Sequence, residues 1–205
     1  MATKVGIIDY GMGNLQSVRN AFEYLGVQVD ILSDSKDLSK VSHMVLPGVG
    51  SFAEGMKNLR SAGWDQALLA IHGKKPFLGI CLGMQLMADK GSEGGDSEGL
   101  GLIPGSVSRL QETGLRIPHV GWNNIQISTP GKLFNEQMAV DYYFVHSYKF
   151  ETAKKEHVIA TCDYGETFCC VAGSDEHLSY GVQFHPEKSH HSGLRILKQF
   201  LKLNC

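Results

Sequence analysis

The segment Pro76-Phe-Leu-Gly-Ile-Cys-Leu-Gly-Met-Gln-Leu-Met-Ala88 decides the fold, because one element ends and another begins around a single cysteine. Residues 76–80 form a short apolar run that predicts a buried strand, and the residues after the cysteine predict the start of a helix. Gly79 and Gly83 flank Cys81, where a side chain would crowd a tight turn. The pattern is typical of a nucleophile elbow, which exposes a reactive side chain at the end of a sheet.

Cys81 has two interpretations at this position. The free N–H groups and the positive dipole end of a helix would favour its thiolate and lower its pKa below the value of about 8.5 for a free cysteine. The alternative is a small buried hydrophobic residue, as many free cysteines are. The glycines at fixed offsets on both sides favour the reactive interpretation.

The segment His185-Pro186-Glu187, far downstream, offers a base and a group to orient it. Proline disfavours the helical region for the residue before it, so we expect an extended segment in which residues two apart face the same side. The Glu187 carboxylate would then reach the imidazole of His185 and stabilise its charged form. Cys81, His185 and Glu187 are therefore a candidate triad; the alternative is a surface turn with a solvated His and Glu.

The chain before Cys81 alternates between strand and helix patterns. Strands are expected at 4–8, 27–32 and 43–46, and helices at 14–25, 52–60 and 64–72. This alternation predicts a parallel sheet covered by helices on both faces. Ligands bind beyond the carboxyl ends of such strands, where both Pro47-Gly-Val-Gly50 and Cys81 fall.

The chain after Cys81 has a different texture. Residues 91–105 are rich in glycine and acids, which predicts a mobile surface loop. Short strands follow at 106–110, 125–128, 142–150, 158–163, 169–172 and 180–184, before a closing helix at 193–203. No linker or repeat divides the chain. We expect residues 1–205 to form one α/β domain, mostly parallel, with antiparallel strands added in the C-terminal half.

Composition excludes several classes of function. The chain has 205 residues and a net charge of -2, so it lacks the basic footprint of a protein that binds nucleic acid or an anionic membrane. Its first residues have no long apolar signal region, and five cysteines without framework spacing suggest free thiols in a reducing compartment. We therefore expect a cytoplasmic protein. We also expect no metal site, because Cys169 and Cys170 would face opposite ways and His190-His191 would be solvated.

Two segments, Gly79-Ile-Cys-Leu-Gly-Met-Gln85 and Gln183-Phe-His-Pro-Glu187, strongly resemble the class I glutamine amidotransferases, the triad-type glutaminase family. The resemblance implies a flavodoxin-like fold, no cofactor, and hydrolysis of glutamine through a glutamyl thioester on Cys81. Further segments, spread over nearly the whole chain, are similar to the branch of this family that serves histidine biosynthesis. They are Asp9-Tyr-Gly-Met-Gly-Asn14, Leu46-Pro-Gly-Val-Gly-Ser-Phe52, Pro118-His-Val-Gly-Trp-Asn123, Tyr143-Phe-Val-His-Ser-Tyr148 and Phe184-His-Pro-Glu-Lys-Ser189.

Attack of a thiolate on the glutamine amide creates an oxyanion, which needs preorganised N–H donors. The N–H of Leu82, directly after the nucleophile, is one candidate. The turn Gly48-Val49-Gly50 offers the other, because glycines on both sides of Val49 let the backbone approach the substrate and rotate a peptide plane. An ordinary strand-to-helix turn is the alternative here.

The resemblance also implies which residues meet the substrate and a partner. Gln85 and the backbone around His146, Ser147 and Tyr148 would hold the amino-acid end of glutamine. The alternative for Gln85 is a helix residue without a ligand, and Ser147 and Tyr148 could equally be sheet residues. A separate (β/α)8 cyclase chain would receive the ammonia, which free in water would mostly be protonated. The residues that match the family's interface with this partner are Asn14, Trp122, Asn123, Tyr143 and Lys188; a core residue is the alternative for Trp122.

Three other functions stay open from the sequence. The chain could serve another synthase, such as one of vitamin B6 or purine synthesis, although Gly11-Met-Gly-Asn14 favours the histidine branch. It could be a non-catalytic regulatory subunit, but a degenerate relative would be expected to lose part of the triad. It could also hydrolyse another γ-glutamyl substrate, and such an enzyme would not need a partner for activity.

Overall fold

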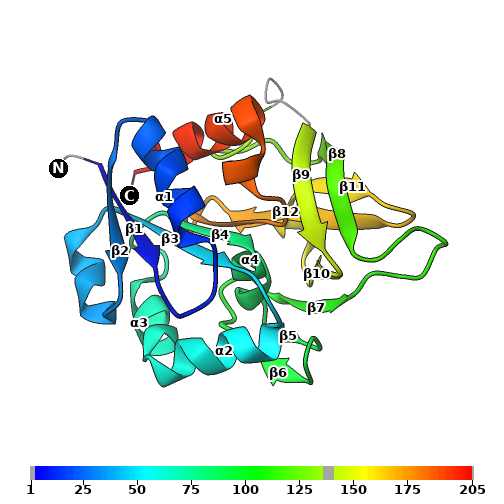
Figure 1. Ribbon diagram of the computed structural model, residues 1–205, viewed down its shortest axis with the longest axis horizontal. Helices are drawn as coiled ribbons and strands as arrows, with labels where there is room; N and C mark the ends of the chain where they lie inside the picture. Colours follow the sequence, from blue (N-terminus) through cyan, green and yellow to red (C-terminus); the bar gives the residue numbers. More distant parts are fainter. Residues whose placement is uncertain (1–2, 136–140, 205) are drawn as a thin grey trace.

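The computed structural model describes residues 3–135 and 141–204, and its centre is a single twisted sheet (Figure 1). Five neighbouring strands run parallel in the order β2-β1-β3-β4-β13. Their bounds are β1 (Lys4–Ile8), β2 (Gln28–Leu32), β3 (His43–Gly48), β4 (Phe77–Cys81) and β13 (Ser179–Val182). The parallel sheet expected from the alternating pattern is therefore confirmed, although β13 comes from the far end of the chain.

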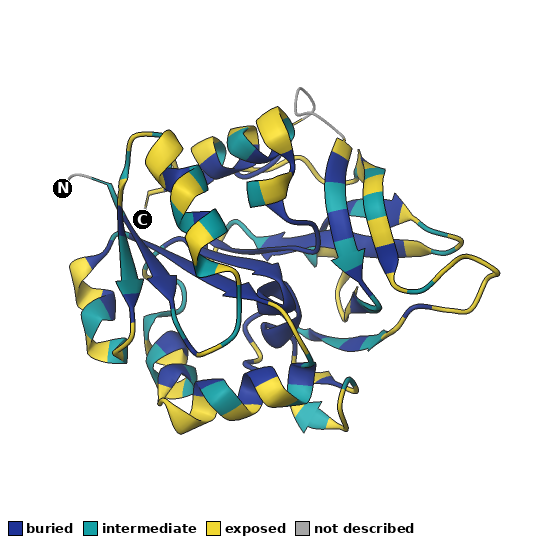
Figure 2. Ribbon diagram, viewed as in Figure 1, coloured by how far each residue is buried: buried dark blue, intermediate teal, exposed yellow. Residues whose placement is uncertain are grey.

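Helices cover both faces of this sheet, because each central strand is apolar on both sides. Helices α1 (Leu15–Tyr24) and α5 (His190–Phe200) lie on one face, and α2 (Phe52–Ser61), α3 (Trp64–Ile71) and α4 (Leu82–Leu86) lie on the other (Figures 1 and 2). Ile7 belongs to the same core as Phe22 of α1, whereas the next residue, Ile8, belongs to the core that contains Leu59 of α2. The two cores thus follow the alternation of side chains along a strand.

The C-terminal half adds antiparallel strands to this sheet. They are β7 (Gly105–Arg109), β8 (His119–Ile127), β9 (Asp141–His146), β10 (Tyr148–Thr152), β11 (Val158–Asp163) and β12 (Thr167–Ser174). Short 3-10 turns occur at η1 (Ser35–Lys40), η2 (Lys155–His157) and η3 (Pro186–Lys188). This mixed arrangement confirms the expected fold class. Within the described residues, no helix has the length and apolar character needed to cross a membrane.

The strand expected at 142–150 is two strands. The chain breaks at Ser147, so that β9 pairs with β8 while β10 pairs with β7 and β12. The carbonyl of Ser147 accepts a hydrogen bond from the Leu110 N–H at 2.9 Å, which holds the corner. A continuous apolar and aromatic run carries no signal for a change of partner strand, so the sequence pattern missed it.

The segment 91–105, expected to be a mobile surface loop, is partly paired with the sheet. This segment contains the short paired strands β5 (Lys90–Gly91) and β6 (Ser97–Glu98), and β5 also pairs with β7. A Cβ on Gly91 would lie 2.6 Å from the ring of Phe52, so this glycine permits close packing. The Ala53 N–H also donates to the carbonyl of Glu93 at 3.1 Å, which ties the loop to α2. Composition alone does not separate glycines that pack from glycines that move.

Candidate active site

Cys81 ends β4 and directly precedes α4, as the elbow pattern predicts. Its φ of 54° lies in the left-handed region, which is strained for a residue with a side chain. A Cβ on Gly83 would overlap the carbonyl of Leu46, and one on Gly79 would lie 2.7 Å from the carbonyl of Gly83. The two glycines are therefore required by close backbone approach, and the turn they permit presents the cysteine at the carboxyl end of the sheet.

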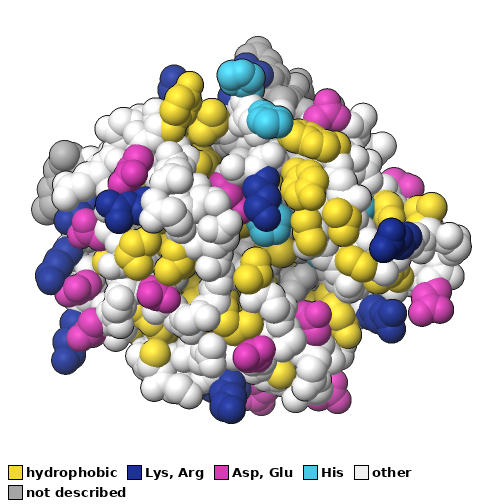
Figure 3. Space-filling view, in the orientation of Figure 1, with side chains coloured by type: hydrophobic (Ala, Val, Ile, Leu, Met, Phe, Trp, Pro, Cys, Tyr) yellow, Lys and Arg dark blue, Asp and Glu magenta, His cyan; other side chains and the backbone are white. Residues whose placement is uncertain are grey.

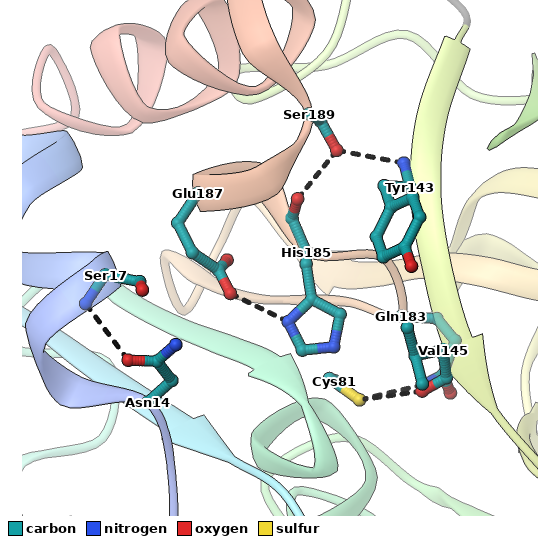
Figure 4. Close-up of polar contacts among 9 residues, drawn as sticks. All are labelled: Asn14, Ser17, Cys81, Tyr143, Val145, Gln183, His185, Glu187 and Ser189. Atoms are coloured by element: carbon teal, nitrogen blue, oxygen red, sulfur yellow. Dashed lines mark hydrogen bonds and ion pairs between the residues drawn. The ribbon is translucent and has the colours of Figure 1, made fainter. Parts of the chain in front are cut away.

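The imidazole of His185 lies between the Glu187 carboxylate and the Cys81 sulfur (Figure 4). Its Nδ1 is 2.8 Å from Oε1 of Glu187, and both side chains are buried. The expected contact is present, but the reason given for it is wrong. Only His185 is extended, and residues from Pro186 onward form the 3-10 turn η3, which curls Glu187 back toward the imidazole. Proline constrains the residue before it, and leaves the residues after it free to turn.

The environment of His185 favours its charged form. Burial lowers the pKa of an imidazole, but the hydrogen bonds and negative charges of Cys81 and Glu187 outweigh burial and raise the pKa of His185 to about 10. The proton on Nδ1 then faces Glu187. At neutral pH the site therefore holds an imidazolium beside the Cys81 sulfur.

Ser189 fixes the backbone that carries His185, and sequence reasoning gave it no role. Its Oγ donates to the carbonyl of His185 at 2.6 Å and accepts from the N–H of Tyr143 at 3.0 Å (Figure 4). The N–H of His185 in turn donates to the carbonyl of Tyr143 at 2.9 Å. His185 is therefore held to β9 at both of its backbone polar groups.

Gln183 is a second residue that the sequence patterns missed. It is fully buried, and its Nε2 lies 3.8 Å from Sγ of Cys81 while its Oε1 accepts from Nε2 of Gln85 at 3.0 Å. Gln85 also donates to the carbonyl of Tyr148 at 3.0 Å. The only sequence signal for Gln183 was its place two residues before the base, within the run that precedes His-Pro-Glu. Its amide connects Cys81 to Gln85, one of the residues expected to hold substrate.

A cavity of about 260 Å³ opens in front of Cys81, slightly below the roughly 300–1,000 Å³ of many small-molecule sites. It brings together residues from the elbow, the glycine turn and the break between β9 and β10. The lining residues are Val49, Gly50, Cys81, Leu82, Gln85, Glu93, Pro118, Val145, His146, Ser147, Tyr148, His185 and Lys188. All the residues expected to stabilise an oxyanion or hold substrate are in this list except Gly48, the buried last residue of β3.

His146 lines this cavity but its ring is already fully bonded. Nδ1 lies 2.8 Å from the carbonyl of Tyr148, and a carbonyl only accepts, so Nδ1 carries the proton. Burial lowers the pKa of His146 to about 3, so Nε2 of the neutral ring accepts from Nδ1 of His119 at 3.0 Å. Burial likewise lowers the pKa of His119 to about 4. The His146 ring and the Gln85 amide therefore both hold the backbone carbonyl of Tyr148 in place, and His119 in turn holds the His146 ring.

Glu93 supplies a carboxylate to the cavity wall from the segment expected to be a mobile loop. Burial raises its pKa, and a hydrogen bond from the backbone of Phe52 partly opposes this effect. No motif pointed to this residue, because its place depends on the packing of the segment 91–105 against α2. It gives the cavity a group that can receive an ammonium.

Of the residues expected at a partner interface, Lys188 lines the cavity, and Trp122 and Tyr143 lie against each other. Trp122 on β8 is 49% exposed, so it is not the core residue that its alternative interpretation required. Its ring stacks on His190 with centroids 5.3 Å apart and meets the edge of Tyr143 at 6.1 Å. Lys188 is exposed and also lines the cavity. Figure 3 shows hydrophobic side chains gathered over this part of the molecule.

The two asparagines in the expected interface have local partners. The side chain of Asn14 caps α1 by accepting from the Ser17 N–H at 3.2 Å (Figure 4). The amide of Asn123 donates to the carbonyl of Asp163 at 2.9 Å. Both side chains are thus held in place by neighbours within the chain.

The cysteines other than Cys81 are Cys162, Cys169 and Cys170, which are buried free thiols, and Cys205, which lies outside the described residues. Burial raises the pKa of Cys162 and of Cys169 to about 12, so these two thiols stay protonated. Among residues 3–135 and 141–204, no cluster of three or more His, Cys, Asp or Glu is arranged to hold a metal ion.

Comparison with known proteins places this geometry in a family. A model of the family "Glutamine amidotransferase class-I" matches residues 6–203. The chain is 45% identical over 203 residues to the imidazole glycerol phosphate synthase subunit HisH 1 of Campylobacter jejuni, covering 97% of this chain and 100% of that protein. It is 40% identical over 201 residues to the chloroplastic imidazole glycerol phosphate synthase hisHF of Arabidopsis thaliana, covering 96% of this chain and 34% of that longer protein.

Solved structures agree on the fold. The structure titled PurLQS from Thermotoga maritima superposes with a TM-score of 0.79 at 15% identity and covers 98% of both chains. At that identity the likeness concerns the architecture alone. The flavodoxin-like sheet with antiparallel additions is thus a shared framework, and the chemistry follows from the residues placed on it.

Proposed function

Because this chain belongs to the class I glutamine amidotransferase family, we propose that it is the glutaminase subunit of an imidazole glycerol phosphate synthase, with Cys81, His185 and Glu187 as its catalytic residues. It hydrolyses glutamine to glutamate and ammonia for histidine biosynthesis. The whole of residues 1–205 works as one domain in this reaction. The observation that carries the assignment of the site is the buried His185, held 2.8 Å from Glu187 and beside the Cys81 sulfur.

The first step is attack by the Cys81 thiolate on the side-chain carbonyl carbon of glutamine. The resulting oxyanion is stabilised by the N–H of Leu82 and by the N–H of Val49, which the flanking Gly48 and Gly50 leave free to rotate. His185 then gives its proton to the departing nitrogen, so that ammonia leaves and a glutamyl thioester remains. Glu187 keeps the imidazole oriented throughout.

The second step is hydrolysis of the thioester. His185 is now neutral, and it takes a proton from a water molecule that attacks the thioester carbon. The same N–H donors stabilise the second oxyanion, after which glutamate leaves and Cys81 is restored as a thiolate. One base thus serves both steps, which is why its orientation is held so firmly by Ser189 and Glu187.

The amino-acid end of glutamine lies against Gln85 and the backbone of His146, Ser147 and Tyr148. The substrate ammonium faces the carboxylate of Glu93, the acidic residue among those that line the cavity. Support for this placement comes from the bonds that make the wall rigid, since Gln85 and His146 both donate to the Tyr148 carbonyl. A rigid wall positions the substrate amide against the nucleophile.

The partner is a cyclase subunit, a (β/α)8 chain that forms a heterodimer with this one and consumes the ammonia. It docks over the cavity mouth through Asn14, Trp122, Asn123, Tyr143 and Lys188. Half-exposed Trp122, with Tyr143 and His190 packed against it, supports this placement, because aromatic anchors dominate protein interfaces. Nucleic acid and membranes are not partners in this proposal, and the cytoplasm is the compartment in which we place it.

The test is glutamate release from glutamine by the purified chain, alone and with a histidine-pathway cyclase subunit and its nucleotide ligand, with Cys81→Ala as the control. We expect strong stimulation by the partner and ligand, which disappears in the Cys81 variant. High activity without a partner would instead identify an independent hydrolase. Silence with this and other cyclase or synthase partners would identify a regulatory subunit.

A further inference from the structure

The loop between β1 and α1 packs directly behind the glycine turn that follows β3. A Cβ on Gly48 would overlap the hydroxyl of Tyr10, and a Cβ on Gly50 would lie 2.5 Å from Cε of Met12. Gly13 approaches the same turn, since its Cβ would be 3.4 Å from the carbonyl group of Pro47. Residues 10–13 are therefore the support on which the turn rests.

The hydroxyl of Tyr10 is the feature of this loop that needs an explanation. Tyr10 is only 5% exposed, and its Oη has no hydrogen-bond partner among the described residues. A buried hydroxyl without a partner destabilises the folded protein, so such groups are rare unless they have a function. Burial, and then the negative charge of Cys81, raise the pKa of Tyr10 far above its ordinary value. The group is therefore a neutral O–H donor at any physiological pH.

The geometry of the peptide bond between Gly48 and Val49 suggests a function for the Tyr10 hydroxyl. In a trans peptide the N–H and C=O groups point to opposite sides. When the Val49 N–H points into the cavity, the carbonyl of Gly48 must point into the protein, where it requires a donor. Tyr10 does not line the cavity, and its hydroxyl lies against Gly48 from the buried side.

We infer that Tyr10 is a positioning residue for the oxyanion turn: its hydroxyl donates to the Gly48 carbonyl when the Gly48–Val49 peptide aims the Val49 N–H at the cavity. The bond forms in the reacting arrangement and is absent from the resting one, so it lowers the energy of the turn only when an oxyanion has to be stabilised. This inference rests on the proposed glutaminase function. Tyr10 itself belongs neither to the triad nor to the residues proposed to bind substrate.

The test compares two single-atom changes in the complex with the cyclase subunit and its ligand. Tyr10→Phe removes the unpartnered hydroxyl, and Tyr180→Phe is the matched control, since Tyr180 is also buried but donates to Asp175. For Tyr10→Phe we expect kcat for glutamate release to fall about 3- to 10-fold, with KM changed less than about twofold and the melting temperature equal or higher. For Tyr180→Phe we expect a lower melting temperature and an unchanged kcat.

Two results would overturn the inference while leaving the proposed function intact. One is an active wild type with an unchanged kcat in Tyr10→Phe. The other is a loss of thermal stability in Tyr10→Phe equal to that in Tyr180→Phe, because the hydroxyl would then be bonded in the resting protein. A wild-type complex that releases no glutamate would instead contradict the proposed function, and this inference with it.

Discussion

Ser189 donates a hydrogen bond from its Oγ to the carbonyl oxygen of His185 across 2.6 Å, and the serine is completely buried. The Ser189 Oγ also accepts a hydrogen bond from the Tyr143 N–H, so this one hydroxyl joins the segment that carries His185 to β9. The relationship matters because a base that drifts by a fraction of an ångström no longer reaches both the sulfur and the departing nitrogen.

Ser189→Ala should reduce both stability and turnover. It leaves the buried N–H of Tyr143 and the carbonyl of His185 without this partner, which costs about 1–3 kcal/mol in the free energy of unfolding. We expect kcat to fall roughly tenfold as the base loses its anchor. Urea denaturation and glutamate release measure the two effects. Ser179→Ala is the control, because Ser179 is equally buried and donates to His177 away from the cavity; a similar loss of kcat in it would sink the positioning role of Ser189.

The charge on His185 should persist well above neutral pH. With a pKa of about 10 in the folded chain and about 6.5 in the unfolded chain, its contribution to stability is fully present below pH 6.5 and is lost as the pH rises through 10. NMR of the ring nitrogens should show the imidazolium titrating near pH 10. In Cys81→Ala the midpoint should move down toward 6.5, because a partner that favours the charge is gone. An unshifted midpoint in that variant would mean that the sulfur does not stabilise the imidazolium.

Glu93→Gln should weaken substrate binding more than catalysis. In the proposed binding mode the Glu93 carboxylate faces the glutamine ammonium equally in the ground state and the transition state, so without it KM should rise about tenfold while kcat stays within about twofold. Steady-state kinetics of glutamate release separate the two. Glu98→Gln, an exposed residue of β6 in the same segment, is the control and should leave both constants unchanged. An unchanged KM in Glu93→Gln would remove Glu93 from the substrate site.

Trp122→Ala should weaken assembly with the cyclase subunit. Aromatic anchors of this kind contribute about 2 kcal/mol or more, so calorimetry should report a Kd raised roughly 30-fold or more. Leu69→Ala on α3 is the control, because Leu69 has a similar exposure of 46% on a helix away from β8 (Figure 1). If both variants bind the partner as the wild type does, the interface lies elsewhere on the chain.

Local patterns in the sequence were sufficient to predict the parallel sheet, the helices on its two faces and the turn at Cys81. The apolar runs at 4–8 and 43–46 and the helical spacing between them predicted a parallel sheet with helices on both faces, because burial on two faces leaves a continuous apolar signature. The glycines around Cys81 predicted the elbow for a similar reason, since a tight turn excludes side chains at fixed offsets. The His-Pro-Glu motif supplied the right residues, although η3 and not an extended chain brings them together.

What the patterns left out depends on contacts between residues far apart in the chain. Gln183 and Ser189 stand in recognisable segments that gave them no role, and Glu93 stands in none. Each gains a place at the site only because the end of β13, the start of α5 and the segment 91–105 pack where they do. The same holds for Tyr10, whose hydroxyl meets Gly48 only after β1 and β3 have paired. The sequence by itself determined which elements form and which residues can react, since these follow from local sterics and periodicity. Only the tertiary structure decided which polar groups are buried, bonded or left without a partner, because burial and hydrogen bonding are properties of the packed chain.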